Sequence, residues 1–325
     1  MGRRFTLAIV SDIHFAGATE RARGDDFEFS PIKNPFLRLP LQAYRKIVWM
    51  KHPMQQNGQF DRFLAEVPPT DFVIANGDFP CGSAWLGLSD DATFESAREC
   101  VGRLRARFGE KLHMTLGDHE LGKSNLLGER GGLRLQSWQR ATGELNLQPF
   151  WQLELGNYVL IGVASTLVSL PVYDRDILPA EQNEWLRLRE LHLAEIREAF
   201  SKLRPEQCVI LFCHDPTALP FLWREDAVKS HAEQIEQTII GHLHSPLYLW
   251  KSRLLAGMPA INFLGTNVRR MSRALNEART WKHFHVRLCP SLAGIELLKD
   301  GGYYTAELDA EAKAPAKFQF HPLPR

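Results

Sequence analysis

The sequence has no long apolar run and no excess of charge of either sign. Its 325 residues include 39 Lys and Arg against 38 Asp and Glu, and 44% of them are hydrophobic. No uninterrupted apolar stretch approaches the ~20 residues of a membrane-spanning helix, which argues against an integral membrane protein. The formal net charge of +1 gives no global field to attract nucleic acid or an anionic membrane. We therefore expect a globular protein without a nucleic-acid partner.

The cysteines do not form a paired set. The chain has five cysteines, Cys81, Cys100, Cys208, Cys213 and Cys289, and no two of them form a Cys-x-x-Cys motif. This usage argues against a disulfide framework or a zinc ribbon and fits a reducing compartment. The apolar run Phe5 to Val10 is too short for the core of a secretory signal, and Ser11-Asp12 follows it. We interpret the run as a buried strand and expect a cytoplasmic protein.

Short apolar segments recur along the chain, and most of them are followed within two residues by Gly, Asp or His. They are rich in Val, Ile, Leu and Phe without alternation, which is typical of strands buried on both faces. The predicted strands cover residues 5–10, 71–75, 111–116, 158–164, 208–212, 238–240 and 260–264. Apolar residues at helical spacing lie between them, within 94–108 and within 186–203. This alternation predicts a layered α/β domain with a mixed sheet or two packed sheets.

Two stretches break this alternation, and no internal repeat or Gly/Ser linker marks a domain boundary. Residues 15–69 are too long for a simple strand-to-helix connection, so we interpret them as a lid-like insertion. Residues 266–287 hold six Lys and Arg against one acidic residue. We predict a single domain over residues 1–305, in which 245–305 supply C-terminal strands and this basic segment. Residues 306–325 are expected to form a loosely attached tail.

One part of the insertion has the pattern of an amphipathic helix. After Pro40 it places apolar and basic residues at helical spacing: Leu41, Tyr44, Ile47 and Val48, with Arg45, Lys46 and Lys51. Core packing of the lid is the interpretation we favour for this helix. Contact of its apolar side with a lipid surface is the alternative.

Polar clusters directly follow five of the predicted strands. They are Asp12-Ile13-His14, Gly77-Asp78, Gly117-Asp118-His119-Glu120, His214-Asp215 and Gly241-His242-Leu243-His244. Because strand carboxyl ends meet at one edge of an α/β sheet, we expect these side chains to lie close together. Carboxylates combined with imidazoles suit Mn, Fe or Zn. In an extended segment, Asp12-x-His14 and His242-x-His244 would each place two ligands on one side.

Each cluster alone is weak evidence, because a Gly-Asp pair is mostly a turn. Together and in this order, from Asp12 to His244, they resemble the motifs of the calcineurin-like metallophosphoesterase superfamily. The resemblance implies a four-layer α/β/β/α sandwich of two mixed sheets, with a dinuclear metal centre at the carboxyl edge of the strands.

The resemblance also implies a role for each motif residue. One metal ion would be bound by Asp12, His14 and His244, and the second by Asp118, His214 and His242. Asp78 would bridge the two ions. His119 would lie outside the ligand shell and face the substrate.

The activity implied is hydrolysis of phosphate esters by in-line attack of a hydroxide that bridges the two metal ions. His119 would act as an acid or stabilise the transition state. We favour manganese, with iron or zinc as alternatives. The sequence leaves two kinds of activity open. One is a phosphomonoesterase, and the other is a phosphodiesterase or pyrophosphatase acting on a nucleotide- or lipid-linked substrate. The non-enzyme alternative is a metal-free interaction scaffold of the same fold, against which the retention of all seven ligand positions argues.

Two positions depart from the family pattern. Asp118 stands where the family usually has Asn, and its extra negative charge should tighten metal binding and weaken Lewis acidity. We expect Asp118→Asn to be tolerated and to alter metal preference. Cys81 stands three residues after Asp78, where Asp or Asn is frequent in the family. A thiol there is no equivalent anion unless its pKa is strongly lowered, so we interpret Cys81 as a wall residue.

The basic segment supplies two candidate substrate contacts. The predicted strand 260–264 comes soon after the last motif, so Arg269 or Arg270 would reach a phosphate near the metal centre. Arg matches phosphate geometry bidentately, which suits a diester or pyrophosphate. The alternative is that the segment is simply a solvated face.

Overall fold

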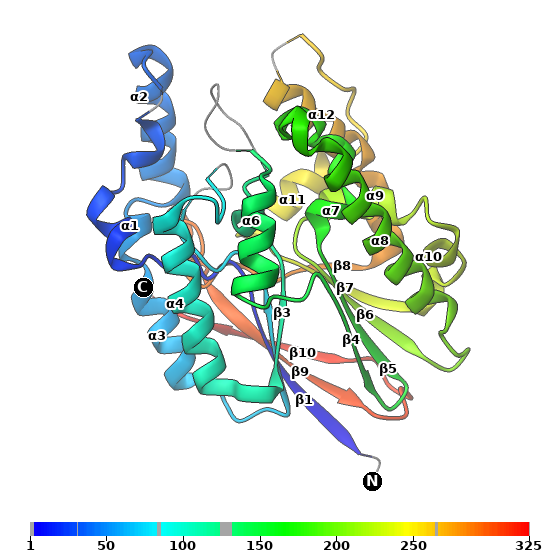
Figure 1. The fold of residues 1–325 in the computed structure, drawn as a ribbon. Coiled ribbons are helices and arrows are strands. Elements are labelled where there is room, and N and C mark those ends of the chain that lie inside the picture. Colours follow the sequence, from blue (N-terminus) through cyan, green and yellow to red (C-terminus); the bar gives the residue numbers. More distant parts are fainter. Residues whose placement is uncertain (1–2, 31, 83–85, 124–131, 264–265, 325) are drawn as a thin grey trace.

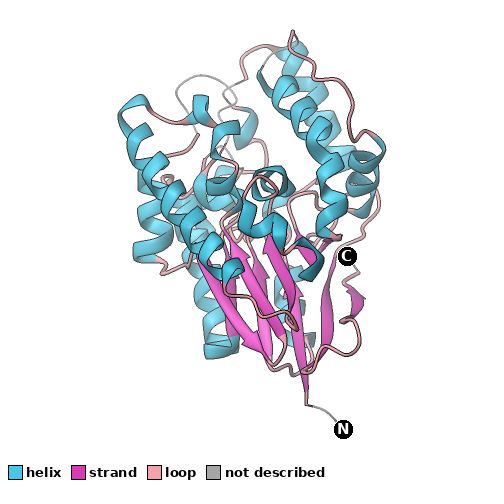
Figure 2. Ribbon diagram, turned by 90° about the vertical axis from the view of Figure 1, so that its right-hand side faces the viewer, coloured by secondary structure: helices cyan, strands magenta, loops and turns pink. Residues whose placement is uncertain are grey.

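Two mixed β-sheets with five strands each form the centre of the molecule (Figure 1). The structure is a computed structural model that describes residues 3–30, 32–82, 86–123, 132–263 and 266–324. Helices cover the outer face of each sheet, and the sheets pack against each other (Figure 2). This arrangement is the four-layer α/β/β/α sandwich that the motifs imply.

The first sheet has the strand order β10-β9-β1-β2-β3. Its strands are β1 (Arg4–Val10), β2 (Phe72–Asn76), β3 (Leu112–Thr115), β9 (Gly302–Asp309) and β10 (Lys317–Pro322). β1, β2 and β3 run parallel, whereas β9 is antiparallel to both β1 and β10. The carboxyl ends of the three parallel strands therefore open onto the same edge.

The second sheet has the strand order β4-β5-β6-β7-β8. Its strands are β4 (Phe150–Leu155), β5 (Tyr158–Val163), β6 (Cys208–Cys213), β7 (Ile235–Ile240) and β8 (Val286–Leu288). β5 to β8 run parallel, and β4 joins β5 as an antiparallel edge strand.

Alternate residues of the central strands enter different cores, which explains why their sequences are apolar throughout. In β1, Leu7 and Ile9 pack between the two sheets, together with Ile210 of β6. Ala8 and Val10 point the other way and belong to the core beneath the outer helices. Each face of the strand is therefore buried, and neither tolerates polar residues.

The α-helices of the described residues are α1 (Ala18–Arg23), α2 (Pro35–Tyr44), α3 (Asn57–Glu66), α4 (Asp91–Phe108), α5 (Asp118–Leu121), α6 (Leu135–Gln139), α7 (Ser165–Val168), α8 (Gln182–Ser201), α9 (Leu219–Leu222), α10 (Asp226–Ser230), α11 (Pro246–Leu254) and α12 (Thr266–Glu277). The two longest of them, α4 and α8, carry the apolar stripes that the sequence predicts. In α4, Ala97, Val101 and Leu104 are buried on the first sheet. In α8, Leu193 and Ile196 are buried on the second. Among the described helices, none has the length and apolar character needed to span a membrane.

The expectation of a loose C-terminal tail over residues 306–325 is wrong. β9 pairs with β1 from Arg4↔Asp309 to Ile9↔Tyr304, and β10 lies at the edge of the sheet beside β9. Ala306 and Leu308 are buried between the sheets. The composition was misleading because few of these residues are buried: Ala306 and Leu308 alternate with less buried residues in β9, and no residue of β10 is buried. An edge strand such as β10 tolerates exposed polar residues and proline.

The predicted strand over residues 260–264 is also wrong. Residues 260–263 have no regular secondary structure, and Leu264 lies outside the described residues. The side chain of Phe263 is 84% exposed, so this apolar segment has no place in a sheet. A short apolar run predicts a strand only where a sheet edge is available to pair with it.

Candidate metal centre and active site

The seven predicted ligands lie together at the carboxyl edge of the two sheets. Six of them lie in loops shortly after β1, β2, β6 or β7, and Asp118 is the first residue of α5, shortly after β3. Their ligand atoms form two groups, within each of which all atoms lie within 4.8 Å of one another. The groups are Asp12, His14, Asp78 and His244, and Asp78, Asp118, His214 and His242. Because Asp78 belongs to both groups, the geometry offers two adjacent metal sites that share one carboxylate.

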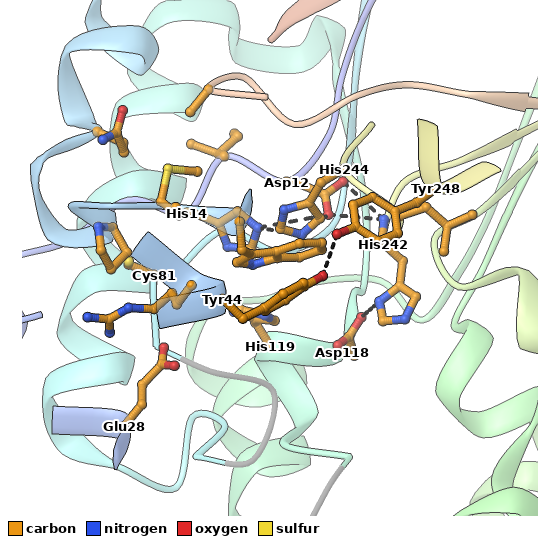
Figure 3. Close-up of a pocket in the computed structure, with 18 of the residues that line it drawn as sticks. Asp12, His14, Glu28, Tyr44, Cys81, Asp118, His119, His242, His244 and Tyr248 are labelled. Atoms are coloured by element: carbon orange, nitrogen blue, oxygen red, sulfur yellow. Dashed lines mark hydrogen bonds and ion pairs between the residues drawn. The ribbon is translucent and has the colours of Figure 1, made fainter. Parts of the chain in front are cut away.

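In the first group, the imidazoles of His14 and His244 lie beside the carboxylate of Asp12 (Figure 3). The Nε2 atoms of His14 and His244 are 3.1 Å apart, and Nε2 of His244 is 3.1 Å from Oδ1 of Asp12. Burial, with neighbouring His119 and His244, lowers the pKa of His14 to about 3. His14 is therefore a neutral imidazole, the form that binds a metal ion.

In the second group, His214 faces two carboxylates. Its Nε2 atom is 3.0 Å from Oδ2 of Asp78 and 3.1 Å from Oδ1 of Asp118. The opposite ring nitrogen, Nδ1, is 2.6 Å from the carbonyl oxygen of Asn76. This contact requires an Nδ1–H donor, which turns Nε2 toward the carboxylates in the way that metal-binding histidines are commonly oriented. The fourth member, His242, places Nδ1 2.8 Å from Oδ1 of Asp118.

Two buried polar atoms at the centre of the site fit a cation. Within the described part of the chain, Nε2 of His214 and Oδ2 of Asp78 have no partner in hydrogen-bond geometry. Buried polar atoms without partners are costly, and a bound cation would satisfy both. The mixture of carboxylate oxygen and imidazole nitrogen suits a divalent transition metal.

The backbone around the site is held in an uncommon conformation. Five of the seven residues have left-handed φ values between 50° and 58°: Asp12, His14, Asp78, His242 and His244. Such conformations cost non-glycine residues of the order of 1–3 kcal/mol each and cluster at functional sites. The expectation of extended Asp-x-His and His-x-His segments is therefore wrong. His242 and His244 also contribute to different groups rather than to a common one.

Glycines in the motifs allow the loops to approach one another closely. A Cβ atom on Gly117 would lie 2.2 Å from Oδ1 of Asp78, and one on Gly241 would lie 2.3 Å from Oδ2 of Asp12. Any side chain at these positions would displace a candidate ligand. The glycines of these motifs therefore have a steric function as well as marking turns.

Glu120 ties the loops after β2 and β3 together, a role that the sequence did not reveal. Its buried carboxylate accepts hydrogen bonds from the backbone N–H groups of Gly117 at 2.6 Å, Phe79 at 2.7 Å and Asp78 at 3.2 Å. The available signal was its position three residues after Gly117, as in a helix capping box. Glu120 thereby positions the shared ligand Asp78.

His119 lies beside the two groups without belonging to either. Its backbone N–H donates to Oδ1 of Asp78 at 2.9 Å, and its ring centroid is 4.6 Å from that of His14. Burial opposes protonation of the ring, but the carboxylates of Asp78 and Asp118 outweigh it and raise the pKa of His119. A protonated imidazole here can donate a proton or stabilise negative charge.

Lys123, which no motif in the sequence marks as a site residue, balances the additional carboxylate at position 118. Its buried Nζ atom lies 3.4 Å from Oδ2 of Asp118 and 2.7 Å from Oδ2 of Asp215. Burial opposes the charge, but Asp118 and Asp215 raise the pKa of Lys123. The hydroxyl of Tyr173 also donates to Asp215, at 3.1 Å. The available signal was a lysine five residues after a carboxylate that stands in place of the usual Asn.

We expect Lys123→Met to destabilise the protein by about 3–5 kcal/mol, because removing one member of a buried ion-pair network leaves uncompensated charge. The measurement is urea unfolding with a chelator present, so that metal binding does not contribute. Adding Asp215→Asn should restore much of the loss. Lys202→Met, which breaks the exposed pair with Glu198, is the matched control and should change stability little. Equal effects of Lys123→Met and Lys202→Met would contradict this assignment.

Cys81 has the properties of a wall residue. It packs with Ala16 and Met54 and lines the cavity in front of His14. Burial, with the nearby carboxylate of Glu20, raises the pKa of its thiol well above the usual value. Cys81 therefore stays a neutral thiol and does not replace the acidic residue frequent at this position.

The two candidate arginines of the basic segment lie in different places on α12. Arg270 pairs with Asp176 and lines a cavity on the far side of His242, together with Lys123. Both arginines line a surface cavity together with Arg273. Arg270 also lines the cavity that Asp118 and His242 share, and Arg269 does not.

A cavity of about 540 Å³ lies in front of the candidate ligands (Figure 3). His14, His119, His242 and His244 form one side of it together with Asp12 and Asp118. Residues of the long insertion form the facing wall, which is mainly apolar: Phe29, Leu41, Tyr44, Trp49, Met50 and Pro53. Trp49 packs on His244 with ring centroids 4.5 Å apart. The hydroxyl of Tyr44 is hydrogen-bonded to that of Tyr248 of α11, so the insertion is joined to the opposite side of the cavity.

Comparison with known proteins gives one family match. The model of the calcineurin-like phosphoesterase family matches residues 5–246, which contain all seven candidate ligands and His119. A search of curated proteins gave no significant match.

Solved structures are similar to this chain at low sequence identity and with TM-scores below 0.5. Phosphopantetheinyl hydrolase from Mycobacterium tuberculosis is 14% identical, with 75% of this chain and 84% of that chain covered and a TM-score of 0.35. Purple acid phosphatase from yellow lupin seeds is 10% identical, with 99% and 52% covered and a TM-score of 0.46. A metallophosphoesterase from Sphaerobacter thermophilus is 10% identical, with 98% and 88% covered and a TM-score of 0.34.

Proposed function

The chain belongs to the calcineurin-like phosphoesterase family, and from this premise we propose that its seven Asp and His ligands form the dinuclear centre of a phosphate-ester hydrolase. The observation that carries the proposal is the presence of two ligand groups that share Asp78 and face a cavity. A metal-free scaffold would not need buried, strained ligands with unsatisfied atoms, since these cost stability without return.

In this proposal each ligand keeps the place that its group gives it. Asp12, His14 and His244 would hold one ion and Asp118, His214 and His242 the other, with Asp78 available to both. Bound divalent ions would supply a water of lowered pKa and Lewis acidity toward the phosphoryl oxygens. Manganese is the metal we propose, since the donors are oxygen and nitrogen without thiolate. Lys123 keeps the charge of the second site close to that of a site with Asn at position 118.

His119 acts on the leaving group in this proposal. Its ring lies beside Asp78 and lines the cavity, so it can reach a substrate oxygen without being a ligand. The neighbouring carboxylates favour its protonated form. It would donate a proton to the departing oxygen, a contribution of about 10²–10⁴ in rate for a well-placed general acid. Arg270 is a lower-ranking candidate contact, because Asp176 already engages its guanidinium.

The proposal is tested by elemental analysis of the purified protein, followed by assay of 4-nitrophenyl phosphate and bis(4-nitrophenyl) phosphate with Mn²⁺. We expect bound transition metal and turnover of at least one ester, abolished by a chelator and restored by metal. The ratio of the two rates separates a phosphomonoesterase from a phosphodiesterase. A protein that binds no metal and hydrolyses neither ester would refute the proposal.

A further inference from the structure

We propose that the substrate is a phosphate ester of a lipid, taken from an anionic membrane surface on which the insertion rests. This inference rests on the proposed phosphoesterase activity and adds a substrate class and a docking surface. The contact surface is α2 with the following π-helical turn, residues 35–49, here called the arm.

The arm exposes large apolar side chains that a protein surrounded by water would normally bury. All ten residues of α2 are described, and none of their side chains is buried. Phe36 is 86% exposed, Leu39 64% and Ile47 66%. None of these three side chains packs into a core. For Ile47, the interpretation favoured from the sequence was core packing of the lid, and it is wrong. A contiguous exposed apolar surface of this kind marks a binding site for a membrane or another molecule.

The excess of positive charge around the arm favours an anionic partner. Between Phe29 and Phe60 the chain has five Lys and Arg and no Asp or Glu, although the whole protein is nearly neutral. Lys33, Lys46 and Lys51 are exposed. Basic residues combined with exposed Phe, Leu and Ile are typical of helices that lie in the interface of an anionic bilayer.

The arm is continuous with the catalytic cavity. Its residues Leu41 and Tyr44 line the wall opposite the candidate ligands, and Trp49 packs on His244. In Figure 1, α2 stands at the end of the molecule opposite the N-terminus, which is the end toward which β1 runs. A lipid whose headgroup phosphate lies at the metal site would thus extend its chains along apolar residues toward the bilayer.

One basic residue of the insertion, Arg45, turns inward and holds the base of the arm. Arg45 is buried at this base, where it donates to Asp26 at 2.7 Å and also to the backbone carbonyl of Asp25. Its guanidinium lies over the ring of Phe29 at 4.7 Å. The arm is therefore anchored through Arg45 while its apolar residues stay available for contact.

Membrane docking is tested by flotation with two kinds of vesicle, phosphatidylcholine alone and an equal mixture with phosphatidylglycerol. We expect binding to the mixed vesicles and at least about tenfold weaker binding by the triple variant Phe36→Ser, Leu39→Ser, Ile47→Ser. None of these three side chains lines the cavity, so turnover of 4-nitrophenyl phosphate or its diester should be unchanged. The matched control is Leu186→Ser with Leu191→Ser, two comparably exposed residues of α8, which should leave binding intact.

The substrate class is tested with ester pairs that differ in their apolar part. The pairs are glycerol 3-phosphate against dioleoyl phosphatidate in the mixed vesicles, and methyl against dodecyl 4-nitrophenyl phosphate. For the pair that is hydrolysed, we expect at least about tenfold higher kcat/KM for the lipid member. The triple variant should lose this preference on vesicles.

The outcomes separate this inference from the proposed function. Turnover of 4-nitrophenyl esters without vesicle binding, or without preference for the lipid member, would overturn the inference and leave the phosphoesterase intact. Absence of turnover with every ester would refute the proposed function, whatever the flotation shows. The oligomeric state is measured by sedimentation velocity. If the protein is a dimer and the triple variant is a monomer, a second copy of the chain covers the arm, and membrane docking is overturned.

Discussion

Replacing Asp78 with Asn is expected to lower kcat for the preferred ester by about 10³ and to reduce the metal content from two ions per chain to one or none. Asp78 is the only residue common to both ligand groups of the described chain. An amide offers one oxygen and no negative charge, so neither ion keeps its full ligand set. Charge stabilisation by metals contributes several kcal/mol to such transition states, and each ~1.4 kcal/mol is a factor of ten.

Elemental analysis and steady-state kinetics of Asp78→Asn are measured beside Asp226→Asn. Asp226 is an exposed residue at the start of α10 and belongs to neither ligand group, so its variant should behave like the natural protein. If Asp78→Asn retained two ions and ordinary turnover, the shared carboxylate would have no role in binding them.

The sequence predicted the site better than its surroundings because each ligand follows a strand. An apolar run that ends in Asp or His fixes both the strand and the position of the polar residue at its carboxyl end. The topology of an α/β sheet then brings Asp12, Asp78 and His214 together although they are far apart in the chain. The left-handed backbone of these loops has no comparable signal, because it depends on contacts between loops.

The charge balance at the second site needed the structure. From the sequence, Asp118 in place of Asn predicts an excess of negative charge at the second site. In the structure, Nζ of Lys123 lies 3.4 Å from Oδ2 of Asp118 and is also paired with Asp215. The spacing of these residues follows no motif, since the ion pair forms between the loops after β3 and β6. The expected effect of Asp118→Asn is accordingly modified: it would leave Lys123 paired with Asp215 and add positive charge beside the second ion.

The insertion was predicted as one unit, but two of its helices differ in burial. Phe60 and Phe63 of α3 are fully buried in the core beneath the first sheet, so this helix belongs to the outer layer of the sandwich. The arm ahead of α3 has a similar density of apolar residues and buries none of the side chains of α2. Composition cannot distinguish the two cases, because apolar residues are needed both for a core and for a lipid or protein partner.

His119→Ala should retain both metal ions and lower kcat by about 10²–10⁴, because the residue lies in the cavity but in neither ligand group. The loss should be larger for an alkyl leaving group than for 4-nitrophenolate, which departs without a proton. Metal content and kcat with both leaving groups are the measurements, and His231→Ala, a surface histidine after α10, is the control. An equal loss with both leaving groups would assign His119 to stabilising phosphoryl charge rather than to proton donation. Unchanged turnover would remove it from the mechanism, and a loss of bound metal would make it a part of the centre itself.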